Sequence, residues 1–99
     1  MLKREAIDGS NQVKITFVIP NDPDQERISV VGDFNNWDPN ATIFVKRQNN
    51  TRSVSATVDA GQRYRFRYYV AADGSWINED SADAYEPNEF GSHNCLLIT

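Results

Sequence analysis

The sequence predicts an all-β fold, an antiparallel β-sandwich, from three observations. Apolar and polar residues alternate over several short segments, which is the two-residue period of a strand with one buried face. Gly, Pro, Asn and Asp separate these segments at intervals of about ten residues. No stretch shows the periodicity of an amphipathic helix. Seven or eight short strands with this spacing indicate a sandwich of immunoglobulin-like type.

The first strands are predicted on either side of an acidic loop. Residues 13–19 alternate apolar and polar side chains up to Pro20, so one face of this strand should be buried. Residues 2–7 precede it across an Asp8-Gly9 turn and are expected to pair with it as an edge strand. After the acidic loop, residues 28–34 are mostly apolar, and we expect that strand to be buried on both faces.

The centre of the chain alternates between loop and strand signals. Residues 35–40 are rich in Asn, Asp and Pro, which cannot continue a sheet. Pro lacks an N–H group, and Asn and Asp side chains compete for backbone hydrogen bonds. Residues 42–46 and 53–58 are predicted to form two short strands, joined by a hairpin turn at Asn49-Asn50.

One later strand carries aromatic residues and arginines at alternating positions. Tyr64, Phe66 and Tyr68 share one face, whereas Arg65 and Arg67 share the other. We expect the aromatic face to lie in the core and the arginine face to lie at the surface.

The last third of the chain is more polar. A tight turn at residues 72–75 leads into a short strand that starts at Trp76. Residues 78–88 are polar and are expected to be irregular. Residues 93–99 form the last predicted strand.

Length and composition favour a single domain over residues 1–99. This length is enough for one hydrophobic core, and the hydrophobic and charged fractions, 39% and 24%, are ordinary for a folded protein. The formal net charge of −4 argues against a nucleic-acid or anionic-membrane partner, because either would require an excess of Lys and Arg. Neutral ligands remain compatible with this charge.

The few cysteines and histidines exclude several kinds of site. Cys95 is the single cysteine, which excludes an intramolecular disulfide and a cysteine-based zinc site and favours a reducing compartment. His93 is the single histidine and has no partner for a metal site. The charged start of the sequence lacks the apolar stretch of a signal peptide, so we expect a cytoplasmic protein. Neither a metal nor a cofactor is expected.

The two tryptophans lie among residues that favour loops. Trp37 ends the string Gly32-Asp-Phe-Asn-Asn-Trp37, and Trp76 follows the turn Asp73-Gly74-Ser75. A tryptophan placed for packing normally lies within an apolar strand, so these neighbours favour partly exposed indoles. Exposed flat aromatic rings suit sugar rings, whose axial C–H groups form an apolar face.

Three blocks of the sequence resemble one known family. Residues 30–38 (VVGDFNNWD), 64–76 (YRFRYYVAADGSW) and 90–98 (FGSHNCLLI) resemble carbohydrate-binding module family 48 and have the separations found there. That family includes the early-set domains of isoamylase and branching enzymes and the glycogen-binding domain of the AMP-activated protein kinase beta subunit. The resemblance covers roughly residues 13–99 and implies an early-set β-sandwich that binds glycogen or a related glucan.

The resemblance also implies a set of carbohydrate-binding residues. The two tryptophans would stack on consecutive glucose units, an arginine and an asparagine would hydrogen-bond the hydroxyls, and an apolar and a hydroxyl residue would precede that asparagine. The implied residues are Trp37, Arg67, Trp76, Phe90, Ser92 and Asn94. The chain departs from the kinase subunit in having Arg in place of Lys, a turn longer by Ala-Ala, and more acidic residues in 78–88.

Each of these residues also has a purely structural interpretation. Trp37 could cap the end of the core, and Trp76 could cover the sheet from one side. Arg67 could be a solvated surface arginine, in an ion pair worth little. Asn94 could bond the backbone of an edge strand. The residues alone leave these alternatives open.

A catalytic site is not expected. Glycoside hydrolysis needs two carboxylates a few ångströms apart, one of them with a raised pKa. The acidic residues of the chain do not lie in apolar surroundings that would raise a pKa; they include Asp33, Asp73, Glu79, Asp80, Asp83 and Glu86. Ser92 and His93 are adjacent and would point to opposite faces of a strand, which excludes a Ser-His-Asp triad.

The sequence therefore predicts non-catalytic binding of an α-1,4-glucan such as glycogen, starch or maltodextrin. The alternative is a protein-interaction or regulatory early-set domain that docks on a glycan-active enzyme or another partner without binding sugar itself. Either function is compatible with a dimer formed through an exposed edge strand.

Overall fold

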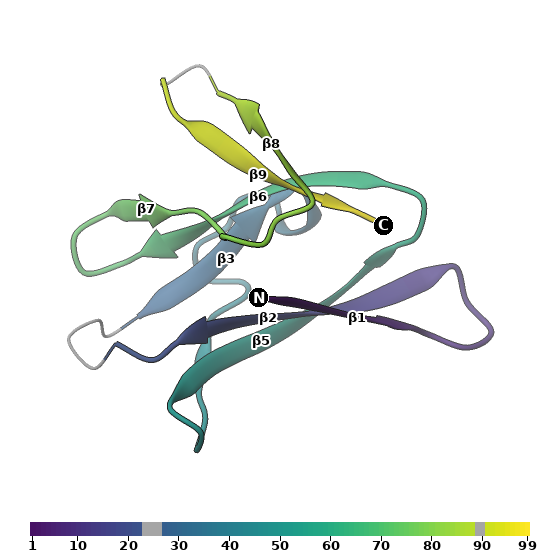
Figure 1. Cartoon of the computed structure of the whole chain (residues 1–99), viewed down its shortest axis with the longest axis horizontal. Coiled ribbons are helices and arrows are strands. Elements are labelled where there is room, and N and C mark those ends of the chain that lie inside the picture. Colours follow the sequence, from purple (N-terminus) through teal and green to yellow (C-terminus); the bar gives the residue numbers. More distant parts are fainter. Residues whose placement is uncertain (23–26, 89–90) are drawn as a thin grey trace.

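Two antiparallel sheets packed face to face make up the structure (Figure 1). It is a computed structural model that describes residues 1–22, 27–88 and 91–99. The predicted all-β, immunoglobulin-like sandwich is confirmed. The described residues form nine strands and one short 3₁₀ helix, η1 (Asp33–Asn35), against the seven or eight strands expected. In this part of the chain, the structure contains no helix with the length and apolar character that crossing a bilayer requires.

Sheet A contains the first two strands and the central hairpin. Its strand order is β1-β2-β5-β4. The strands are β1 (Leu2–Ala6), β2 (Gln12–Pro20), β4 (Val45–Lys46) and β5 (Thr51–Asp59). The expected pairing of the N-terminal edge strand with the next strand is confirmed. Ile15 and Phe17 of β2 are fully buried, as the alternation of apolar and polar residues predicts.

Sheet B contains the remaining strands and is centred on β6. Its strand order is β3-β6-β9-β8, and β7 also pairs with β6. The strands are β3 (Ile28–Gly32), β6 (Arg63–Val70), β7 (Ser75–Ile77), β8 (Ala84–Pro87) and β9 (His93–Ile98). Along one edge of β6, β9 pairs as far as Phe66 and β7 pairs from Tyr68 onward. Arg67 therefore lies between these two pairings.

The core lies between the sheets and is rich in aromatic residues. Phe17 of sheet A makes edge contacts with Phe66 and Tyr68 of sheet B, at ring-centroid distances of 5.4 and 6.3 Å. As predicted, the aromatic face of β6 points into this core, and its arginines occupy the opposite face. All of β3 is buried, which confirms the expected burial, but the strand ends at Gly32 and not at residue 34, because η1 begins at Asp33.

The prediction of one continuous strand over residues 42–46 is wrong. Residues 42–44 run along β3: Val30 N–H donates to Thr42 O (2.8 Å) and Phe44 N–H to Ile28 O (2.9 Å). Only β4 pairs with β5. The chain thus crosses from sheet B to sheet A within five residues. Apolar alternation is the same on either side of such a crossing, so it does not reveal which strand the backbone pairs with.

The prediction that residues 78–88 are irregular is wrong in part, and one of these polar residues is buried. They contain strand β8, which pairs with β9, and they contain Glu79, which is only 4% exposed. The four residues of β8, Ala-Tyr-Glu-Pro, show no alternation of apolar and polar side chains, so no strand pattern is visible there. Glu79 is buried because hydrogen bonds satisfy it, a condition that sequence patterns do not report.

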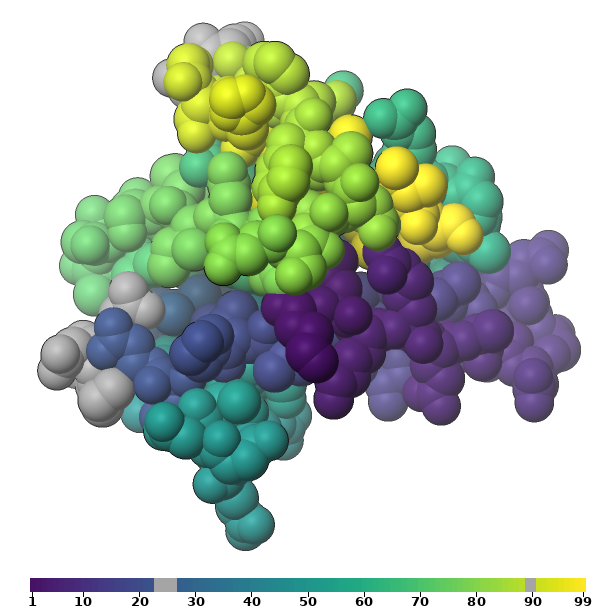
Figure 2. Space-filling view, viewed as in Figure 1, coloured from purple at the N-terminus to yellow at the C-terminus, as the bar shows by residue number. Residues whose placement is uncertain are grey.

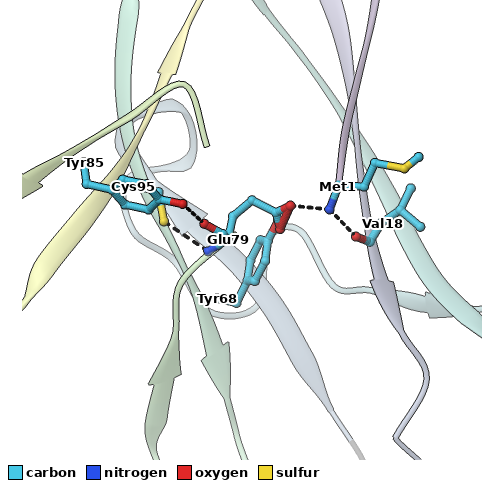
Figure 3. A network of polar contacts seen from close by, with 6 residues as sticks. All are labelled: Met1, Val18, Tyr68, Glu79, Tyr85 and Cys95. Carbon is cyan, nitrogen blue, oxygen red and sulfur yellow. Dashed lines mark hydrogen bonds and ion pairs between the residues drawn. The ribbon is translucent and has the colours of Figure 1, made fainter. Parts of the chain in front are cut away.

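The buried Glu79 connects the two sheets (Figure 3). Its Oε2 accepts a hydrogen bond from the Tyr68 hydroxyl (2.9 Å), and Oε1 accepts one from the α-ammonium group of Met1. Its carbonyl accepts a bond from the Tyr85 hydroxyl, and its N–H donates to Cys95 Sγ (3.2 Å). Burial raises the pKa of the Tyr68 hydroxyl and of the Cys95 thiol above their ordinary values.

The N-terminal strand also covers the segment that precedes β8. Figure 2 shows the start of the chain against this segment, and the Arg4 guanidinium forms an ion pair with Asp83 there. The same carboxylate accepts the backbone N–H of Ile98 (2.7 Å). These contacts join β1 of sheet A to the segment that precedes β8 and to β9 of sheet B.

Candidate functional site

A hollow of about 690 Å³ lies on the outer face of sheet B, away from the core. Paired residues of antiparallel strands point to the same side, so the pairs Tyr69–Trp76 and Glu86–Asn94 place side chains from four strands on this face. We call this hollow the groove. It is lined by Trp37, Arg65, Arg67, Trp76, Glu86, Pro87, Asn88 and Asn94.

Trp37 is held in the groove by an unusual backbone and by one carboxylate. Asn36 and Trp37 both have left-handed φ angles, 57° and 56°, which turn the chain sharply after η1. The indole Nε1–H donates to Asp33 Oδ1 (3.0 Å), and Asp33 Oδ2 accepts the backbone N–H of Arg65 (2.8 Å). Asp33 therefore fixes the indole relative to β6, while the side chain stays half-buried.

The residues before Trp37 explain why this loop has its sequence. A Cβ on Gly32 would lie 2.4 Å from the carbonyl oxygen of Arg65, so only glycine allows this close approach of β3 to β6. The amide of Asn35 closes the turn, because it accepts Gly32 N–H (3.0 Å) and donates to Val30 O (2.9 Å). The residues Gly-Asp-Phe-Asn-Asn thus form the turn that places Trp37 in the groove.

Trp76 lies on the short strand β7 and is 44% exposed. Its ring contacts the Tyr69 ring at a centroid distance of 5.0 Å, and the Cζ atom of Arg67 lies 5.5 Å from the indole centroid. The preceding turn is closed by Ser75 N–H, which donates to Asp73 Oδ1 (3.0 Å). Hydrogen bonds from Ser75 lower the pKa of Asp73. Trp76 thus presents a large aromatic surface to solvent.

Arg67 is held by neutral oxygens. Its Nε donates to Asn78 Oδ1 (2.9 Å) and its Nη2 to Ser92 Oγ (3.3 Å). Asn78 is fixed in turn, because it donates to His93 O (3.1 Å). No acid in the described part of the chain forms an ion pair with Arg67. The guanidinium is therefore oriented beside Trp76, and no acidic side chain among the described residues forms an ion pair with it.

The remaining predicted residues come from the last block of sequence. Asn94 lines the groove from β9, and its Oδ1 lies 3.4 Å from Asn88 Nδ2. Ser92 supports Arg67 and donates its own N–H to Asn88 Oδ1 (3.1 Å). Phe90 lies outside the described residues. The structure brings Trp37, Arg67, Trp76 and Asn94 together in the groove, with Ser92 bonded to one of them.

Four groove residues were not predicted from the sequence as site residues: Arg65, Glu86, Pro87 and Asn88. Arg65 Nε forms an ion pair with Glu86 Oε1 across the outer face of sheet B. Arg65 could have been found, because it lies two positions before Arg67 and therefore on the same strand face. Glu86 carried no such signal, because strand β8 itself was not predicted.

The groove offers two indoles, two guanidinium groups, two side-chain amides and a carboxylate. Aromatic faces surrounded by hydrogen-bonding groups suit a ligand that is apolar on its faces and rich in hydroxyls at its rim. Among the described lining residues only Glu86 carries a carboxylate, whereas glycoside hydrolysis requires two. The described residues also contain no group of three side chains that could hold a metal ion.

Comparison with known proteins relates the chain to a segment of two enzymes. It is 35% identical over 89 residues to an amylopullulanase of Thermoanaerobacterium thermosulfurigenes, across 87% of this chain and 4% of that protein. It is 31% identical over 84 residues to an amylopullulanase of Thermoanaerobacter thermohydrosulfuricus, across 81% of this chain and 5% of that protein. No protein-family profile matches the chain. The chain is thus homologous to a short segment of a glycan-active enzyme and spans only a small fraction of these relatives.

Proposed function

We propose that this chain is a non-catalytic module that binds α-1,4-linked glucans such as glycogen, starch or maltodextrin. Trp37 and Trp76 stack on glucose units, and Arg67 and Asn94 hydrogen-bond their hydroxyls. The observation that carries the proposal is that these four residues, far apart in the sequence, line one solvent-open groove. A role in the core would instead have buried the two indoles, and Trp76 is 44% exposed.

The similarity to amylopullulanase segments supports a glycan-related role. We further propose that the chain is an early-set domain of carbohydrate-binding module family 48, that residues 1–99 act as one domain, and that it works in the cytoplasm. The single described carboxylate in the groove supports the absence of catalysis, because retaining and inverting glycosidases both require two.

The groove should bind short glucans weakly. A glucose face that covers roughly 60 Å² of an indole contributes about 1.5 kcal/mol at ~25 cal/mol per Å². Of three or four hydrogen bonds, the neutral ones add ~1 kcal/mol each and those from the Arg67 guanidinium ~1.5–3 kcal/mol each. Together with two stacked indoles, they exceed an association cost of ~4 kcal/mol by about 4–7 kcal/mol. We therefore expect a dissociation constant between ~10 μM and several mM. Such sites become effective on polymers, where repeated units raise the local ligand concentration.

The proposal is tested by titrating the chain with maltoheptaose while tryptophan fluorescence is followed. A saturable change is expected, because both tryptophans line the groove. Cellohexaose, which has β-1,4 linkages, is the matched control and should give no such change. No response to maltoheptaose up to tens of millimolar would overturn the proposal and favour a domain that docks on a protein partner.

A further inference from the structure

The ion pair of Arg65 and Glu86 lies in the groove and does little to hold the sandwich together. The two side chains are 56% and 33% exposed, and ion pairs this exposed contribute little to stability. The pair joins β6 to β8 across the outer face of β9, which lies between them. Two charged side chains from different strands therefore meet in the same hollow as the tryptophans.

Most of the hydrogen-bonding capacity of this pair is unused. A guanidinium carries five N–H donors, and a carboxylate has two acceptor oxygens. Within the described residues, Arg65 uses only Nε for a side-chain bond, and Glu86 uses only Oε1. The pair therefore presents donors and an acceptor side by side toward the groove.

Asp33 fixes this pair relative to the indole of Trp37. One of its carboxylate oxygens accepts the indole N–H, and the other accepts the backbone N–H of Arg65. The stacking face and the polar pair are thus connected through a single side chain. A site arranged in this way before the ligand arrives loses less entropy on binding.

We propose that Arg65 and Glu86 form a polar subsite for two neighbouring hydroxyls of the glucose unit stacked on Trp37. The guanidinium donates to one hydroxyl, and the carboxylate accepts a bond from the other. This inference rests on the proposed glucan-binding function and adds a specificity to it. Because the opposite charges of the pair cancel and it offers a donor beside an acceptor, the subsite suits a neutral diol.

The subsite is tested with the variants Arg65→Ala and Glu86→Ala in an NMR titration with maltoheptaose. The two tryptophans give two indole N–H signals, so binding is followed at each of them. Each variant should weaken binding about 5- to 20-fold, the loss expected for one charge-assisted hydrogen bond in an exposed groove. Glu86→Gln keeps a carbonyl acceptor and should stay within about threefold of the unmodified chain.

The matched control is Arg63→Ala, an exposed arginine on the same face of β6 that does not line the groove. It should bind maltoheptaose as the unmodified chain does. If the unmodified chain binds maltoheptaose and the Arg65 and Glu86 variants bind as tightly as Arg63→Ala, the subsite is wrong while the proposed function stands. If the unmodified chain does not bind at all, the proposed function itself fails.

Discussion

The two faces of β6 use polar side chains in opposite ways. On the inner face, Tyr68 is only 1% exposed, and its hydroxyl donates a hydrogen bond to the buried carboxylate of Glu79. On the outer face, Arg65 and Arg67 reach into an open groove, where they contact a half-buried acid or neutral oxygens. One strand thus holds the fold together on one side and presents the groups proposed to bind a ligand on the other.

The difference follows from burial. Removing one partner of a buried hydrogen bond leaves the other unsatisfied, which costs about 1–3 kcal/mol. An exposed ion pair is worth about 0–1 kcal/mol, because water replaces whichever partner is lost. Substitutions on the inner face should therefore change stability, and substitutions in the groove should change binding.

The largest effect is expected for Glu79→Ala. This change leaves the buried Tyr68 hydroxyl without its acceptor and opens space between the sheets. The free energy of unfolding, measured by urea denaturation, should fall by about 2–4 kcal/mol. Binding of maltoheptaose by the folded fraction should be unchanged, because Glu79 does not line the groove.

The control for this variant is Asp80→Ala. Asp80 is the next residue, is exposed, and should be replaceable at a cost below about 0.5 kcal/mol. Equal stability of the two variants would show that the buried carboxylate does not support the fold.

The next largest effect is the loss of glucan binding in Trp37→Ala. The change removes the indole that Asp33 holds in the groove, and the weak binding expected for a short glucan should then fall below detection. The domain should stay folded, with an unfolding midpoint close to that of the unmodified chain. If the variant still binds maltoheptaose in the same fluorescence titration, the assignment of this site is wrong.

The stability of the protein at alkaline pH should depend on the inner face of β6, through the hydroxyl of Tyr68. Burial raises the pKa of Tyr68 above its ordinary value of 10.0, so the folded state keeps this proton where the unfolded state releases it. Below that ordinary value both states hold the proton. Above it, stability should fall by up to about 1.4 kcal/mol per pH unit.

The measurement is urea unfolding between about pH 8 and 11, for the unmodified chain and for Tyr68→Phe. The variant should be less stable at pH 8, because Glu79 loses a donor, but its stability should fall less steeply above about pH 10. Identical slopes for the two proteins would contradict a buried, protonated Tyr68.

The sequence predicted the fold because its strongest signals are local. Alternation on β2 and on β6 predicts both strands and their buried faces, and glycine-containing turns mark several of their ends. The sequence did not predict the strand pairing of segments whose partner strands lie far away in the chain. The crossing of residues 42–46 between the sheets and the position of β8 depend on edges that no local pattern describes.

The same reasoning applies to the groove. Trp37, Trp76 and Arg67 could be proposed from their neighbours and from the family resemblance. Glu86 could not, because its place beside Arg65 depends on the pairing of β8 with β9. The burial of Glu79 was not predicted, because a carboxylate buried by hydrogen bonds looks the same in sequence as one in water.

The smallest effect is expected for Trp76→Ala, and it tests how unequal the two tryptophans are. Trp37 is fixed by a carboxylate, whereas Trp76 lies 44% exposed on a three-residue strand. Loss of roughly 60 Å² of stacking area costs about 1.5 kcal/mol, or about a tenfold weaker affinity for maltoheptaose. Arg67 keeps its bonds to Asn78 and Ser92 without the indole, so part of the site survives. Trp76→Phe should recover part of the loss, and unchanged affinity in Trp76→Ala would mean that this indole only covers the sheet.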